Sequence, residues 1–103
     1  MLIHKFSMAD DGAFPIDAAG TSGVVNIRLN GSRSGLFQAT QGAAADVDIT
    51  LQGSMDNTNW VDIQAYVDVN NATKAAVVTL FPYMRVVTAN AAGTVTVSTY
   101  IGE

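Results

Sequence analysis

The feature that most constrains the fold of this chain is a repeated alternation of apolar and polar residues, interrupted at short intervals by turn-forming residues. Val47, Ile49 and Leu51, for example, alternate with polar residues, and this period of two is typical of a strand buried on one face. No segment combines the apolar spacing of an amphipathic helix with convincing capping residues. The sequence therefore predicts an all-β fold.

The expected strands are short and separated by turns. They cover residues 25–30, 46–52, 60–66, 75–80, 83–89 and 94–101, with weaker runs at 2–7, 14–16 and 35–40. We expect a loop over 13–23, and either a loop or one helical turn over 41–45. About eight short strands, with no room for crossover helices, favour an antiparallel β-sandwich, jelly-roll-like in arrangement.

Two of these strands carry more specific expectations. The clearest alternation is in 25–30, where Val25, Ile27 and Leu29 share the face expected to be buried. The run 60–66 has apolar residues on both faces, so we expect it to be covered on both sides.

Length and composition limit the organisation and the partners. A chain of 103 residues fits a single β-sandwich domain over 1–103. It is 49% hydrophobic and only 14% charged, which predicts a homo-oligomer or a docked surface, unless exposed alanines such as those at 43–45 account for the excess. A net charge of −4 argues against a nucleic-acid partner. No segment approaches the roughly 20 apolar residues of a membrane helix, so no membrane partner is expected, and the first residues lack a signal-peptide core.

The chain shows no pattern of an active site. Nucleophile-elbow, Walker and Rossmann motifs are absent, and the single histidine, His4, has no obvious partner. We therefore expect no catalytic residue, no cofactor and no metal ion, and we predict that the protein is not an enzyme. A small glycosidase would be the enzymatic alternative.

Acidic and aromatic residues are the remaining candidates for ligand sites. Asp46 and Asp48 share one face of a strand, where solvated carboxylates are expected. Residues 55–59 resemble part of a calcium loop but lack its glycine and closing glutamate, so an Asx-type turn is favoured. The candidates for a sugar-binding platform are the aromatic residues Trp60, Tyr66, Tyr83 and Tyr100. For a lone tryptophan, burial in the core is the competing interpretation.

Three segments carry a resemblance to a known family. Residues 46–63 read DVDITLQGSMDNTNWVDI, a strand that ends in Gly-Ser and is followed by a hairpin with Asp and Trp. Residues 81–86 (FPYMRV) and 93–97 (GTVTV) continue the pattern. It resembles that of small β-sandwich virion proteins of tailed bacteriophages. Similar hairpins occur in discoidin-like and carbohydrate-binding sandwiches, so the motif reports fold more than function.

A physical reason connects these hairpins. Gly53 and Asp56 are expected to shape a tight loop, and Trp60 is expected to plug the open end of the sandwich beneath it.

The resemblance also implies a function. Virion proteins this short are often capsid decoration (cement) proteins, which form homotrimers on the outer head surface and clamp neighbouring major capsid subunits. The leading expectation is thus a structural virion protein, made in the host cytoplasm and located on the capsid surface. The alternative is a carbohydrate-binding or host-adhesion module of a phage fibre or tail.

The amino-terminal segment is the candidate for partner binding. It comprises Leu2, Ile3, His4, Lys5 and Phe6. This segment is either an arm that adds a strand to a neighbouring subunit or an ordinary first strand.

Overall fold

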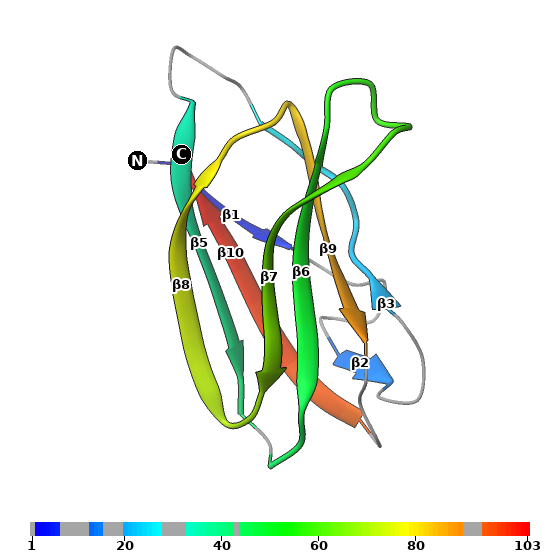
Figure 1. Ribbon diagram of the computed structural model, residues 1–103, viewed down its shortest axis with the longest axis vertical. Helices are drawn as coiled ribbons and strands as arrows, with labels where there is room; N and C mark the ends of the chain where they lie inside the picture. Colours follow the sequence, from blue (N-terminus) through cyan, green and yellow to red (C-terminus); the bar gives the residue numbers. More distant parts are fainter. Residues whose placement is uncertain (1, 7–12, 16–19, 28–32, 43, 90–93) are drawn as a thin grey trace.

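All regular structure in the described part of the chain is β-strand. The computed structural model describes residues 2–6, 13–15, 20–27, 33–42, 44–89 and 94–103 (Figure 1). The strands are β1 (Ile3–Phe6), β2 (Ala13–Pro15), β3 (Gly20–Thr21), β4 (Val25–Asn26), β5 (Ser34–Gln41), β6 (Val47–Ser54), β7 (Val61–Val69), β8 (Ala72–Thr79), β9 (Tyr83–Ala89) and β10 (Thr94–Gly102). None of the described residues belongs to a helix long and apolar enough to cross a membrane.

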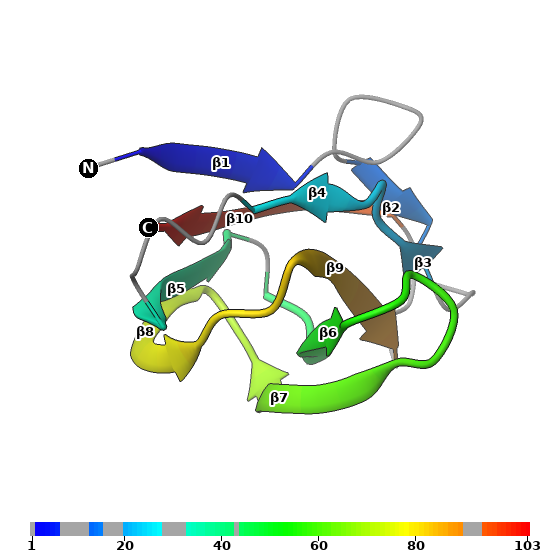
Figure 2. The same cartoon turned by 90° about the horizontal axis from the view of Figure 1, so that it is seen from above.

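The strands form two antiparallel sheets, stacked as two layers in Figure 2. The first sheet has the order β1-β10-β5-β8, and the second has the order β3-β9-β6-β7. β2 also pairs with β10, on the side where β1 pairs. Phe6 at the end of β1 lies opposite Thr99, and Ala13 at the start of β2 lies opposite Thr96, so β2 continues the edge of the sheet that β1 begins. β4 pairs with β9 on the same edge as β3. β1 and β2 share one position beside β10, and β3 and β4 share one beside β9, so the ten described strands occupy eight positions. Their order is that of a jelly roll, which confirms the predicted fold class.

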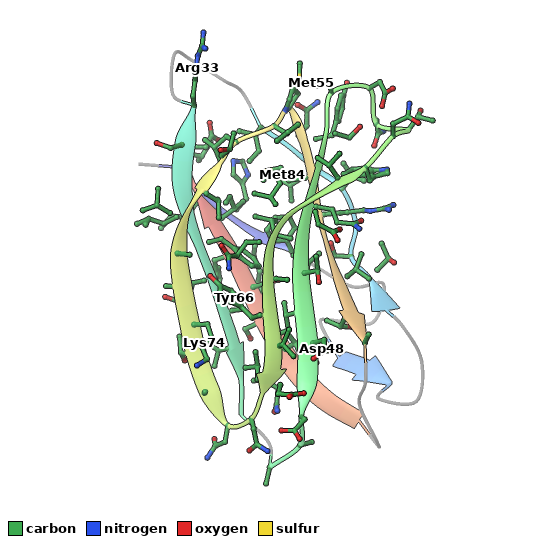
Figure 3. All side chains as sticks on the ribbon, viewed as in Figure 1. Arg33, Asp48, Met55, Tyr66, Lys74 and Met84 are labelled. Atoms are coloured by element: carbon green, nitrogen blue, oxygen red, sulfur yellow. The ribbon has the colours of Figure 1, made fainter. Side chains whose placement is uncertain are left out.

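The core lies between the two layers and is built by alternate residues of the long strands. In β6, Val47, Ile49 and Leu51 are fully buried while the residues between them are half-buried, as predicted. The buried apolar residues are Phe6, Ile27, Phe37, Ala39, Val47, Ile49, Leu51, Val69, Val78, Leu80, Met84, Val86, Val97 and Ile101. Met84 belongs to this core and Tyr66 packs against it; both are labelled near the middle of Figure 3.

An aromatic group at Phe37 joins the two layers. Phe37, in β5, is fully buried, and the ring of Tyr66 from β7 stacks on it with centroids 5.5 Å apart and planes 2° apart. Phe6 from β1 meets Phe37 edge-on at 6.3 Å. The hydroxyl of Tyr66 donates to the backbone oxygen of Phe37 at 3.2 Å, and desolvation raises the pKa of this phenol. Rings and a hydrogen bond therefore hold β7 against the opposite sheet.

The prediction for residues 60–66 was wrong in its burial. β7 is the edge strand of the second sheet, and Val61 and Val67 are 51% and 68% exposed. Its register on β6 shifts at two points, so strict alternation breaks down. As a result, Ile63 and Tyr66, which are three residues apart, both pack against the core.

Two other predictions need correction. The strand expected at 25–30 is only Val25–Asn26 among the described residues; Ile27 is buried as predicted, and 28–30 lie outside the described part. The loop expected at 13–23 contains β2 and β3. For 41–45, Gln41 ends β5 and residues 44–45 form a bend, so the helical alternative is not found in the described residues.

Gly53 provides a test of how tightly β6 packs. A Cβ atom at this position would lie 2.5 Å from Cδ1 of Ile63 and 2.7 Å from the ring of Phe81. We expect Gly53→Ala to lower the free energy of unfolding by about 1–3 kcal/mol, because the neighbouring side chains must move. Urea denaturation followed by circular dichroism measures this change.

Gly42 is the matched control, because a Cβ atom there would meet nothing within 4 Å. Gly42→Ala should leave the unfolding midpoint nearly unchanged. Equal losses in the two variants would show that the packing around Gly53 is not responsible.

Candidate functional site

The β6–β7 hairpin loop, residues 55–60, is organised by one carboxylate. Oδ1 of Asp56 accepts hydrogen bonds from the backbone N–H groups of Thr58 (2.9 Å) and Asn59 (2.8 Å). The carboxylate also accepts from Oγ of Ser54 at 2.9 Å and from Nδ2 of Asn59 at 2.7 Å. Asn57, with φ of 61°, takes the left-handed conformation that this turn requires. The loop is therefore an Asx-type turn, as the sequence favours.

These bonds hold Asp56 in its ionised form. The backbone N–H of Asn59, followed by its side-chain amide and the N–H of Thr58, lowers the pKa of Asp56 far below the ordinary value of 3.8. The carboxylate is engaged by donors of its own loop, so it is not arranged as a calcium ligand. In the described part of the chain, no three His, Cys, Asp or Glu residues gather in a way that would hold a metal ion.

Trp60 ends this loop and lies on the outer surface of the second sheet. Its side chain is half-buried, and it does not belong to the residues packed against the core. The guanidinium of Arg85, from β9, lies 4.2 Å from the centroid of the indole ring in a cation–π arrangement. The expectation that Trp60 plugs the sandwich was wrong. Phe81 and Ile63 fill the space beside Gly53 instead.

A row of polar side chains continues from Arg85 across the sheet. Nε of Arg85 donates to Oε1 of Gln52 at 2.8 Å, and Nε2 of Gln52 donates to Oδ1 of Asp62 at 2.8 Å. These contacts follow from the register, in which Gln52 of β6 faces Arg85 on one side and Asp62 on the other. The two partners determine the orientation of the Gln52 amide. A flipped amide would place its NH₂ group against the Nε–H of Arg85 and its oxygen against the carboxylate of Asp62. We call Trp60, Arg85, Gln52 and Asp62 the Trp60 surface.

The Trp60 surface retains unused hydrogen-bonding capacity. Arg85 donates to Gln52 through Nε, and neither of its Nη groups forms a hydrogen bond with another residue of the described ranges. Asp62 accepts a hydrogen bond on Oδ1, and its Oδ2 remains able to accept another. An indole with part of its surface in solvent thus lies beside a fixed donor and a fixed acceptor. This combination suits a neutral, hydroxyl-rich ligand with apolar faces.

The four aromatic candidates do not form one platform. Tyr66 stacks inside the core, and Tyr100 lies on the outer side of the first sheet. Tyr83 is two residues before Arg85 on β9, so it shares the outer face on which Trp60 lies. Sequence reasoning identified Trp60 but missed Gln52, Asp62 and Arg85 as a group, because only the cross-strand register reveals that they are neighbours.

The Asp46 and Asp48 carboxylates have structural partners. Oδ1 of Asp48 accepts from the backbone N–H of Asp68 at 3.0 Å, and Oδ1 of Asp46 accepts from Nδ2 of Asn70 at 3.1 Å. Asp68 has φ of 54°, a left-handed conformation that is uncommon inside a strand. The pair therefore supports the irregular end of β7.

The amino-terminal segment is a strand of its own sheet. Residues Ile3–Phe6 pair with β10, so in the single chain this segment is the ordinary first strand. Phe6 is part of the core, and Nε2 of His4 donates to Oε2 of Glu103 at 2.6 Å. Of the five residues proposed for partner binding, only Leu2, Ile3 and Lys5 are exposed.

Comparisons with known proteins give fold neighbours only. No family model matches the sequence, and no curated protein sequence matches it. A carbohydrate-binding module from Cellvibrio mixtus lichenase 5A, in complex with cellotriose, has a TM-score of 0.63 and 17% identity, covering 100% of this chain and 98% of its own. The C-terminal carbohydrate-binding module of a laminarinase from Zobellia galactanivorans has a TM-score of 0.58 and 10% identity, covering 98% and 88%.

A protein of another kind has a similar fold. The mitogen from Yersinia pseudotuberculosis has a TM-score of 0.52 and 14% identity, covering 98% of this chain and 85% of its own. Identities this low show a shared small β-sandwich and nothing about shared ligands. No phage protein family is identified by these comparisons.

The lowered pKa of Asp56 predicts an acid-resistant loop. A carboxyl group with a lowered folded-state pKa contributes its full stability above its unfolded value, here 3.8, and loses it progressively as the pH falls from there through the lower folded value. We therefore expect the amide resonances of Thr58 and Asn59 to stay unchanged as the pH passes through 3.8. A two-dimensional NMR titration measures them.

Asp56→Ala is the companion variant. It removes the acceptor, so hydrogen exchange at Thr58 and Asn59 should become faster while the core strands keep their protection. A titration of the wild-type amides centred near 3.8 would contradict the assignment.

Proposed function

We propose that this chain is a non-enzymatic carbohydrate-binding module that serves in host adhesion, and that the Trp60 surface is its binding site. One observation carries the proposal. A half-buried tryptophan on the outer surface is fixed beside a continuous row of hydrogen-bonded polar side chains, Arg85, Gln52 and Asp62.

The chemistry of this surface matches that of a sugar ring. A pyranose presents C–H groups on its faces and hydroxyl groups at its rim, so it needs an apolar plane with donors and acceptors beside it. Trp60 supplies the apolar group, the Nη groups of Arg85 supply donors, and Oδ2 of Asp62 supplies an acceptor.

The hydrogen bonds within the row favour binding. Because Gln52 bonds both Arg85 and Asp62, the two charged groups are already oriented before a ligand arrives. Less side-chain entropy is then lost on binding. The fold similarity to carbohydrate-binding modules supports the proposal through architecture, since such a sandwich positions sugar sites in other proteins.

A second candidate is the capsid decoration role implied by the sequence resemblance. It is favoured by the exposed apolar residues on the outer side of the first sheet, Ile3, Leu36 and Val77, which form a surface suited to protein contacts. In that role the domain would bind major capsid subunits at the head surface.

The carbohydrate proposal is tested by glycan-array screening of the wild-type protein, followed by calorimetric titration of the best ligand. We expect Trp60→Ala and Arg85→Ala each to weaken binding at least about tenfold, or about 1.4 kcal/mol. Arg85→Lys should also weaken binding, because lysine cannot stack on the indole as a plane while donating to Gln52.

Tyr100→Ala is the control for the calorimetric affinity of a single site, since this aromatic residue lies on the opposite sheet. It should bind like the wild type, and thermal melts should show that every variant is folded. A protein that binds no glycan but co-sediments with mature phage heads would replace this proposal with the decoration role. A loss in Tyr100→Ala equal to that in Trp60→Ala would move the site elsewhere.

A further inference from the structure

The outer face of the first sheet is almost free of charge. Its outward residues, given by alternation and register, are Ile3 and Lys5 of β1; Ser98, Tyr100 and Gly102 of β10; Ser34, Leu36, Gln38 and Thr40 of β5; and Thr73, Ala75, Val77 and Thr79 of β8. Lys5, at the β1 edge, is the one charged residue in this set of described residues, and Glu103 borders the face beside Gly102 and Val77. Depletion of charge is the compositional mark of the centre of a protein interface.

Exposed apolar side chains form a row across this face. Ile3 and Leu36 lie on either side of Gly102, which is buried and has no side chain, and Leu36 faces Val77, so the exposed side chains come from β1, β5 and β8. Ile3 is 61% exposed, Leu36 is 48% exposed and Val77 is 71% exposed. Isolated exposed residues are ordinary, whereas several on one face indicate an interaction surface.

On this face, the side chain of Leu36 projects between two hollows. Leu36 and Gly102 line both of them. The hollow on the Val77 side has a volume of about 240 Å³, and the one on the Tyr100 side has a volume of about 150 Å³. Even the smaller has the volume of roughly five water molecules, enough for the four-carbon side chain of leucine.

We propose that this face packs against the same face of a second copy of the chain, forming a two-fold symmetric dimer. In the dimer, Leu36 of each copy enters a hollow beside Leu36 of the other. The projection and the hollows lie side by side on one surface, so the surface is complementary to itself. Self-complementarity is what a two-fold interface requires.

The size of the face agrees with this arrangement. The thirteen outward positions, on strands about 4.8 Å apart and spaced roughly 6.8 Å along each strand, cover on the order of 400 Å² in projection. Side-chain relief increases this area toward the roughly 800 Å² per partner of a stable interface.

Charge also favours a second copy on this side. The chain carries a net charge of −4, and Asp62 and Asp68 are exposed on β7 of the second sheet. Among the described residues, the outward set of the first sheet contains no aspartate or glutamate, and Glu103 lies at its border.

The inference is independent of the sugar proposal. It uses the sheet opposite to the Trp60 surface, so a dimer would carry two Trp60 surfaces on its two outer sides. If the carbohydrate proposal also holds, the dimer binds in a bivalent manner and gains avidity on a surface with repeated sugars.

The oligomeric state of the full chain tests the proposal. Light scattering coupled to gel filtration, with sedimentation equilibrium, should give twice the mass of the chain for the wild type. Val77→Lys should shift the protein to the monomer at the same concentration, because it places a charge in the apolar row. Val67→Lys is the matched control: it replaces an equally exposed valine, 68% against 71%, on the other sheet, and should stay dimeric.

A cross-link provides a second measurement that does not depend on stability. The chain has no cysteine, so Leu36→Cys introduces a single thiol near the proposed two-fold axis. Mild oxidation should convert it to a covalent dimer, whereas Val67→Cys should remain largely monomeric. A wild-type monomer at high concentration, a trimer insensitive to Val77→Lys, or equal cross-linking of both cysteine variants would overturn the proposal. Val77-dependent binding of a monomer to capsids would assign the face to that partner instead.

Discussion

Burial of apolar side chains between two sheets is the interaction on which the rest of this structure depends. The chain has no cysteine to form a disulfide, so the two layers are held by packing and hydrogen bonds. Phe37 occupies the centre of that packing, with Phe6 from its own sheet and Tyr66 from the opposite sheet against it. The position of Asp62, and hence the row that reaches Arg85, follows from the pairing of β7 with β6.

The sequence was sufficient for elements in which the side-chain alternation is regular. In β6, Val47, Ile49 and Leu51 are buried as their spacing indicates, and β9 coincides with the predicted range 83–89. Prediction failed at β7 because two register shifts break the alternation, and no local pattern announces them. It failed at Trp60 because the choice between core and surface depends on what else fills the space near Gly53. Phe81 fills it, from a segment more than 20 residues away.

The two outer faces of the sandwich differ in chemistry although both belong to the same small fold. On the second sheet, polar residues at cross-strand positions bond one another and hold an indole and a guanidinium together. On the first sheet, the corresponding positions other than Lys5 are neutral or apolar, and two shallow hollows lie among them, one of them bordered by Glu103. Since each face is made by alternate residues of strands whose other residues build the core, the same period of two specifies both the fold and its surfaces. Neither face is visible in the sequence until the strand order is known.

The pairing of β1 with β10 determines how the domain responds to mechanical force. These strands are antiparallel neighbours, and Ile3 lies opposite Gly102, so the first and last strands present their outer ends side by side (Figure 1). The backbone N–H of Glu103 donates to the oxygen of Leu2 at 2.8 Å, and the His4–Glu103 contact lies next to it. Tension applied through both ends would load these contacts first and then the remaining pairs one after another, as in opening a zipper. Resistance to pulling would therefore be limited by single hydrogen bonds at that edge and would not reflect the strength of the whole core.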